Sequence, residues 1–151
     1  GAFNGLGRLS TLALHHNFLI TLPANLFRDS GSITELYMSN NKLKAFPEGL
    51  FTPLKNVIYL ILDANNLTTV PASMFTSSRQ LTYLHLQNNR IKTLPSVPFS
   101  SHLKTLSLFN NLLTTLPDEM FTKQVWQIED LKLQNNLLTK VPRGIFSAYT
   151  I

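Results

Sequence analysis

The chain has 151 residues, of which 44% are hydrophobic and 14% are charged, and its net charge is +5. This length suits one domain with a substantial core, and the hydrophobic fraction is too high for a disordered chain. No apolar run approaches the roughly 20 residues of a membrane-spanning helix, so we expect no membrane contact within this segment. The absence of cysteine excludes a disulfide framework, a thiolate nucleophile and a cysteine-bound metal.

Six similar segments follow one another along the chain. One asparagine recurs in each of them, at intervals of 24, 24, 24, 22 and 25 residues. Self-similarity at such a period is the signature of stacked repeats. Residues 1–8 read as the tail of a preceding segment, and the six repeats start at Leu9, Ile33, Val57, Leu81, Leu103 and Ile128.

Each segment fits the template L-x-x-L-x-L-x-x-N-x-L-x-x-L-P-x-x-x-F, in which Ile, Val, Met or Phe replaces some of the leucines. The fourth and sixth positions are two residues apart, which places both side chains on one face of a short strand. One such face cannot close a core alone, so neighbouring segments must stack and pair their strands. Proline at the fifteenth position ends the strand pairing and holds an extended return.

The recurrent asparagines are predicted to form a ladder at the turn that follows each strand. A buried primary amide has two donor hydrogens and an acceptor, enough to bond the backbone of its own turn and of the adjacent segment. The alternative is a set of solvent-exposed turn residues. The predicted ladder is Asn17, Asn41, Asn65, Asn89, Asn111 and Asn136, and the rings predicted to fill the core behind the strands are Phe27, Phe51, Phe75, Phe99, Phe121 and Phe146.

With these motifs the chain resembles a leucine-rich repeat protein over nearly its whole length. The Leu-Pro-x-x-x-Phe tail is similar to the typical 24-residue subclass, which occurs mainly in extracellular proteins such as Toll-like receptor ectodomains, variable lymphocyte receptors and matrix proteoglycans. The resemblance implies an α/β repeat, a right-handed curved leucine-rich-repeat solenoid with a concave parallel β-sheet and convex turns or short 3₁₀ segments.

Cysteine-rich caps usually close both ends of a protein of this family, and residues 1–151 contain neither cap. We therefore expect a fragment of a longer ectodomain whose bare edges make the isolated chain unstable or cause it to self-associate, for example as a homodimer. The leucines expected to be exposed at these edges are Leu9, Leu12, Leu131 and Leu133.

Strand alternation predicts that the second, third, fifth, seventh and eighth positions of each repeat face the concave side. Aromatic and apolar residues gather there in the middle repeats, as at the hot spots of protein interfaces. The alternative is that Tyr and Ile simply suit strands by propensity. Charges at the ends of this face, Lys104, Glu129 and Asp130 among them, are expected to form a polar rim. The predicted ligand-binding set is Tyr37, Tyr59, Ile61, Tyr83, His85, Phe109, Glu35, Asp63, Gln87 and Lys132.

Other features of the sequence point to weaker candidates. The basic excess lies on a lateral edge, at Lys42, Lys44, Arg90 and Lys92, where solvated turn charges are favoured over contact with an anionic partner such as nucleic acid. Asn66 begins an Asn-Leu-Thr glycosylation sequon and is expected to be exposed. Trp126, in the inserted stretch of the fifth repeat, is expected to plug local packing and not to anchor a ligand.

The sequence offers few candidate catalytic or metal-binding residues. His15 and His16 are expected to adjoin on a strand and project oppositely, which does not suit a metal site. His85 lies near Asp63 but lacks a nucleophile and a pocket. The sequence has no glycine-rich phosphate loop. We therefore expect no enzyme, no cofactor and no metal.

The favoured function is recognition of a protein or pathogen-derived ligand, as the extracellular module of a receptor, adhesion or immune protein at the cell surface or secreted. Two alternatives are an extracellular matrix or developmental scaffold protein and an innate sensor of a non-protein ligand.

Overall fold

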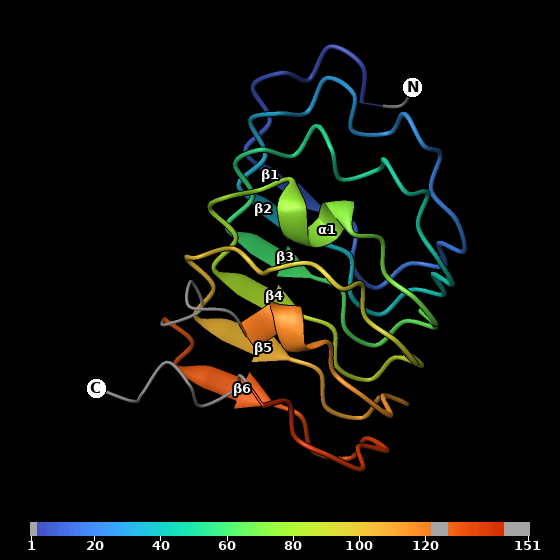
Figure 1. The fold of residues 1–151 in the computed structure, drawn as a ribbon. Helices are drawn as coiled ribbons and strands as arrows, with labels where there is room; N and C mark the ends of the chain where they lie inside the picture. The colour runs from blue at the N-terminus through green and yellow to red at the C-terminus, as the bar shows by residue number, and fades with distance from the viewer. Residues whose placement is uncertain (1–2, 122–126, 144–151) are drawn as a thin grey trace.

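A parallel sheet runs through the computed structural model, which describes residues 3–121 and 127–143 (Figure 1). Each strand spans the third to fifth positions of a repeat and pairs with the strand of the next repeat, in the order β1 to β6. The strands are β1 Thr11–Ala13, β2 Glu35–Tyr37, β3 Tyr59–Ile61, β4 Tyr83–His85, β5 Thr105–Ser107 and β6 Asp130–Lys132. The described residues also form a short α-helix, α1 Ser73–Thr76, and a 3₁₀ helix, η1 Asp118–Phe121.

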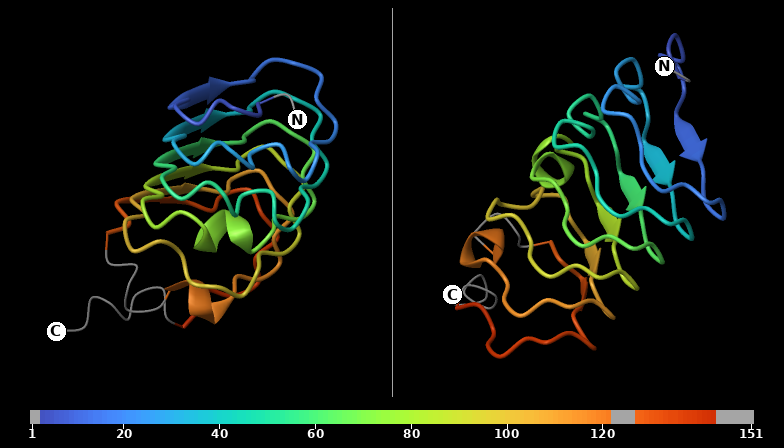
Figure 2. Two further views of the ribbon diagram at one scale, coloured as in Figure 1. Left: turned by 90° about the horizontal axis from the view of Figure 1, so that it is seen from above. Right: turned by 90° about the vertical axis from the view of Figure 1, so that its right-hand side faces the viewer.

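The repeats stack as a curved solenoid with the strands on one side and the return segments on the other. Figure 2 shows that the return segments fan out while the strands lie close together, so the sheet lines the concave side. Both α1 and η1 lie on the convex side, opposite the strands. The predicted solenoid with an inner parallel sheet and convex turns is therefore confirmed.

Leucines at the fourth and sixth positions of the repeats build the core behind the sheet. The central strand leucines Leu36, Leu60 and Leu84 are at most 2% exposed. The predicted phenylalanines Phe27 to Phe121 are also buried, and the rings of Phe75 and Phe99 lie 5.1 Å apart. Aromatic rings therefore fill the wider convex side, where the repeats spread apart. Phe146 and Trp126 lie outside the described residues.

Asparagine side chains link each repeat to its neighbours at the turn after the strand. Asn65 donates from Nδ2 to the carbonyl oxygens of Leu62, in its own repeat, and Met38, in the preceding one, both at 3.0 Å. Its Oδ1 accepts the backbone N–H of Leu43 at 3.1 Å. The pattern recurs at Asn41, Asn89, Asn111 and Asn136, as the sequence predicts. The prediction is wrong for Asn17, which is exposed and donates only to the Leu14 and His15 carbonyls of its own turn.

The first strand is better covered than its place in the sequence suggests. Leu12 is only 8% exposed, and Leu9, Leu131 and Leu133 are half-buried. Phe3 packs against the core and contributes to this cover. The expectation of exposed leucine edges is therefore wrong for Leu12, because residues of the preceding tail pack at this end. The homodimer inferred from those edges stays a prediction.

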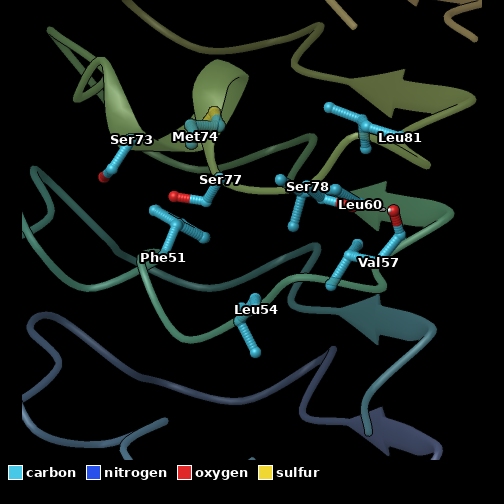
Figure 3. A pocket seen from close by; sticks show the side chains of 9 residues that line it. All are labelled: Phe51, Leu54, Val57, Leu60, Ser73, Met74, Ser77, Ser78 and Leu81. Carbon is cyan, nitrogen blue, oxygen red and sulfur yellow. Dashed lines mark hydrogen bonds between the residues drawn. The ribbon is translucent and has the colours of Figure 1, made fainter. Parts of the chain in front are cut away.

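A cavity of about 10 Å³ lies inside the solenoid, mainly between the second and third repeats (Figure 3). Residues of α1 and of the preceding return segment line it, including Phe51, Leu54, Ser73 and Met74. This volume is about that of one water-sized probe, which is too small for an organic ligand. This cavity is therefore not the place where a ligand is recognised.

Candidate ligand-binding face

The residues predicted to bind a ligand lie together on the concave side of the sheet. In β2, β3 and β4 the middle residue is buried while its two neighbours are half-buried, which places the neighbours on the opposite face from the core. None of the ten predicted residues is buried: nine are half-buried, and Lys132 is exposed. In-register pairing aligns the third-position residues Glu35, Tyr59 and Tyr83 side by side. The placement of the set therefore follows from strand alternation and register.

Two tyrosines form the centre of this face. The rings of Tyr59 and Tyr83 stack with centroids 4.5 Å apart and planes only 7° from parallel. Parallel, in-register strands bring equivalent side chains within about 4.8 Å, which matches the stacking distance of flat rings. Desolvation, with a further contribution from Tyr83, raises the pKa of the Tyr59 hydroxyl. The pair therefore presents a flat aromatic surface at the centre of the sheet.

The N-terminal half of the face carries oriented carboxylates. Glu35 accepts a hydrogen bond from the Tyr37 hydroxyl at 3.0 Å, and desolvation followed by this bond raises the pKa of Tyr37. Asp63 accepts a hydrogen bond from the Ser39 hydroxyl at 2.7 Å. Ser39 is itself buried, although its position faces the concave side, because a small side chain lies below its larger neighbours.

The C-terminal half of the face carries ion-paired side chains and one buried hydroxyl group. Lys104 pairs with Glu129, and Lys132 pairs with Asp130, each at 3.1 Å. The hydrogen bond that the Lys104 ammonium donates to Glu129 raises the pKa of Lys104. Ser107 is 2% exposed, and its hydroxyl has no hydrogen-bond partner among the described residues. The predicted rim charges thus exist, but they neutralise each other at this end.

His85 occupies the middle of the face without a catalytic arrangement around it. Burial lowers its pKa, while Asp63 opposes this effect. The Asp63 carboxylate is already engaged by Ser39, and none of the described residues forms a hydrogen bond with the His85 ring. The imidazole is thus one more flat, half-buried surface beside Ile61. Gln87 lies nearby, with a covered Oε1 that has no partner among the described residues.

Sequence reasoning missed a second role for asparagine, at the eighth position of the repeat. This residue has a positive φ in every repeat: His16, Asn40, Ala64, Asn88, Asn110 and Asn135. Asparagine tolerates this left-handed conformation better than most residues, which explains the four Asn-Asn pairs at 40–41, 88–89, 110–111 and 135–136. The amides of Asn88, Asn110 and Asn135 also join in a chain, at 2.7 and 2.8 Å. The signal was the Asn-Asn pair itself.

Two predictions about individual residues are wrong. His15 and His16 lie beyond the end of β1, and their rings meet edge to face at 5.3 Å. They do not project oppositely, because the positive φ of His16 turns the chain. Asn66 is half-buried and not fully exposed, because its repeat neighbours crowd the edge where its N–H bonds the Leu43 carbonyl.

The lateral edge carries exposed cations and one prominent ring. Lys42, Lys44, Arg90 and Lys92 are all exposed, and no carboxylate among the described residues pairs with them. The Lys42 ammonium lies 5.1 Å from the centre of the Phe18 ring, which is 81% exposed. Asn66 and Thr68 separate the two basic pairs, as the sequence indicates.

Within residues 3–121 and 127–143, no group of three or more His, Asp or Glu side chains is arranged to hold a metal ion. Nor does any helix in that part of the chain have the length and apolarity needed to cross a membrane.

Comparisons with known proteins place the chain in a family. A family model described as leucine rich repeat matches residues 1–43, 32–91, 55–101 and 79–124. Among solved structures, the chain is similar to YopM from Yersinia enterocolitica WA-314, with 27% sequence identity and a TM-score of 0.70. That match covers 89% of this chain but only 26% of the YopM chain. A search of curated proteins found no match.

Solenoids of this kind are typically binding scaffolds for other proteins and not enzymes. The repeated asparagine ladder, the inner parallel sheet and the four overlapping matches together show that this chain belongs to the leucine-rich repeat family.

Proposed function

We propose that this chain is the recognition module of an extracellular receptor, adhesion or immune protein that binds a protein or pathogen-derived ligand through its concave face. The observation that carries the proposal is the Tyr59–Tyr83 stack at the centre of the sheet, flanked by Tyr37 and Phe109. Tyrosine provides a large contact area at a low cost in rotamer entropy, and a hydroxyl for polar contacts.

The rigidity of the sheet supports this assignment. Each strand is fixed by its neighbours and by the asparagine ladder, so the aromatic side chains stand on a preorganised surface. Preorganisation reduces the ordering cost of association, which otherwise opposes binding. A half-exposed aromatic cluster with polar neighbours on such a surface is the composition found at interface hot spots.

An affinity capture with paired variants tests the proposal. The chain is immobilised, a ligand is captured from secreted and cell-surface proteins, and its affinity is measured for the wild type and for the Tyr59→Ala/Tyr83→Ala double variant. We expect the double variant to lose at least about 2 kcal/mol of binding free energy, roughly 30-fold in Kd. Phe18→Ala, which removes an exposed ring from the lateral edge, is the control and should leave the affinity unchanged. An undiminished affinity in the double variant would contradict the concave site.

A second candidate function is a matrix or developmental scaffold protein, which would use the same face and give the same variant results. A third is a sensor of a non-protein ligand such as nucleic acid, favoured only by the unpaired cations of the lateral edge. Counterion release makes such binding fall steeply between about 50 and 300 mM salt. A salt-independent affinity for the captured ligand would reject the third candidate.

Extracellular localisation is part of the proposal and is supported by the Leu-Pro-x-x-x-Phe subclass pattern. Expression through a secretory pathway tests it together with the Asn66 sequon, whose Thr68 is exposed. A mass shift that a glycosidase removes, and that Asn66→Gln abolishes, is the expected result. Secreted protein without that mass shift would reject glycan attachment, because the half-buried Asn66 would then be out of reach of the modifying enzyme.

A further inference from the structure

The charges of the concave face are unevenly satisfied. In the C-terminal half, both lysines of the face are held in ion pairs, Lys104 with Glu129 and Lys132 with Asp130. In the N-terminal half, Glu35 and Asp63 have no cationic partner among the described residues. The repeats beside β2 and β3 therefore present negative charge that the fold itself does not neutralise.

Each of these two carboxylates is held in place through one oxygen only. Glu35 accepts hydrogen bonds from Tyr37 at 3.0 Å and from Thr11 at 3.5 Å, both on Oε2. Asp63 accepts the Ser39 hydroxyl on Oδ1. The second oxygens, Oε1 of Glu35 and Oδ2 of Asp63, take no hydrogen bond from the described residues. The structure thus orients two acceptors and leaves one lone-pair site of each open.

An aromatic face lies directly beside the first of them. Glu35 of β2 pairs in register with Tyr59 of β3, whose ring is stacked on Tyr83. Tyrosine rings attract cations through the negative charge of their faces, and the attraction grows where water is partly excluded. A carboxylate and a ring in adjacent positions are the two groups that a guanidinium binds best, by paired hydrogen bonds and by stacking.

The charge of the rest of the chain strengthens the contrast. Four carboxylates and two lysines leave the concave positions at −2, so the remainder of this +5 chain carries +7. A basic partner is repelled by the lateral and convex surfaces and attracted to the concave one. An acidic partner meets the opposite pattern and is directed to the edge that carries Lys42 and Arg90.

We propose that the β2–β3 end of the concave face binds an arginine-bearing basic segment of a partner protein, with one guanidinium on Glu35 and Tyr59 and a second cation on Asp63. This inference rests on the proposed function and names the class of its ligand. Arginine is expected over lysine because its planar fork engages one carboxylate and one ring together.

The test uses a defined probe, the peptide acetyl-Gly-Arg-Gly-Arg-Gly-amide, titrated into the ¹⁵N-labelled 151-residue chain and followed by NMR. We expect shifts of the backbone amides of β2 and β3. The lysine counterpart should bind several-fold more weakly, and the glutamate counterpart should not shift these amides. The Glu35→Gln/Asp63→Asn double variant keeps the shape of both side chains, and each amide still has an oxygen that can accept the neighbouring hydroxyl hydrogen. Because the negative charges are removed, the double variant should lower the affinity for the arginine peptide about tenfold or more.

A matched control separates a local site from the field of the whole chain. Asp29→Asn/Glu48→Gln changes the net charge by the same amount at two exposed residues of the return segments. We expect it to change the affinity less than about twofold, because exposed charges that far from the site are screened. An equal loss in both double variants, or shifts confined to the lateral edge, would overturn the proposal.

The captured partner distinguishes this inference from the proposed function. If Tyr59→Ala/Tyr83→Ala weakens its binding and Glu35→Gln/Asp63→Asn does not, the concave site stands and the arginine assignment is wrong. If neither double variant weakens binding, the proposed concave site and the arginine assignment are both wrong. If both weaken binding, and the partner's arginine-to-alanine variants do the same, the inference holds.

Discussion

The asparagine ladder gives the sharpest prediction about stability, through the substitution Asn65→Ala. The Asn65 amide accepts the N–H of Leu43 and donates its two hydrogens to the carbonyls of Met38, Leu62 and Asp63 at 3.0 to 3.3 Å. Asn65 is 6% exposed, so water does not replace these contacts.

The cost follows from which groups lose their only partner. The Met38 carbonyl keeps a hydrogen bond from Asn41, and the Leu62 carbonyl keeps one from Asn89. The Leu43 N–H is left unpaired in the interior. Three hydrogen bonds at about 1 kcal/mol each, together with the desolvation of one orphaned donor at about 1–3 kcal/mol, give a loss of about 4–6 kcal/mol in the free energy of unfolding.

Asn17 provides the internal comparison, because it is exposed and bonds only the Leu14 and His15 carbonyls of its own turn. Asn17→Ala should therefore cost about 1 kcal/mol or less. Equilibrium unfolding in urea, followed by circular dichroism, measures both variants, and equal m-values check that the same surface unfolds. If Asn65→Ala destabilises the chain no more than Asn17→Ala, the inter-repeat hydrogen bonds are not the source of the stability assigned to them.

Two further predictions concern the eighth position and the central histidine. Ala64 has φ of +54° where most repeats have Asn, so Ala64→Asn should raise the free energy of unfolding by up to about 1 kcal/mol by relieving left-handed strain, and a lower thermal midpoint would contradict this. Burial lowers the pKa of His85 below its ordinary value of 6.5, so the unfolded chain binds the proton more tightly. His85 should therefore stabilise the fold above pH 6.5 and lose that contribution as the pH falls through the lowered pKa. Unfolding midpoints at several pH values for the wild type and His85→Gln measure it, and an identical pH dependence would refute it.

Much of the fold could be predicted because the repeat encodes it many times over. The spacing of Leu12 and Leu14 sets one strand face, and the recurrent Asn after it sets the turn, so register and facing follow for all repeats. The position of Tyr59 beside Tyr83 follows from the same arithmetic. One residue out of pattern changes little, since its neighbours fix the strand.

Features that depend on packing between repeats could not be predicted in this way. The half-burial of Asn66, the cover over Leu12 and the contact between His15 and His16 arise from side chains that meet across the stack. The ion pair of Lys104 and Glu129 depends on rotamers that no repeat template specifies. Sequence periodicity determines the position of a residue in its repeat and the face it lies on, but it does not determine which side chains of neighbouring repeats it contacts.

Hydroxyl-radical footprinting of the free chain and of the chain with its captured ligand tests the central claim most directly. The claim is that the inner wall of the solenoid is both open to solvent and the place of recognition. We predict that Tyr59 and Tyr83 are oxidised in the free chain and protected in the complex, while Phe18 on the lateral edge is oxidised equally in both. Protection of Phe18 with continued oxidation of both tyrosines would contradict the account.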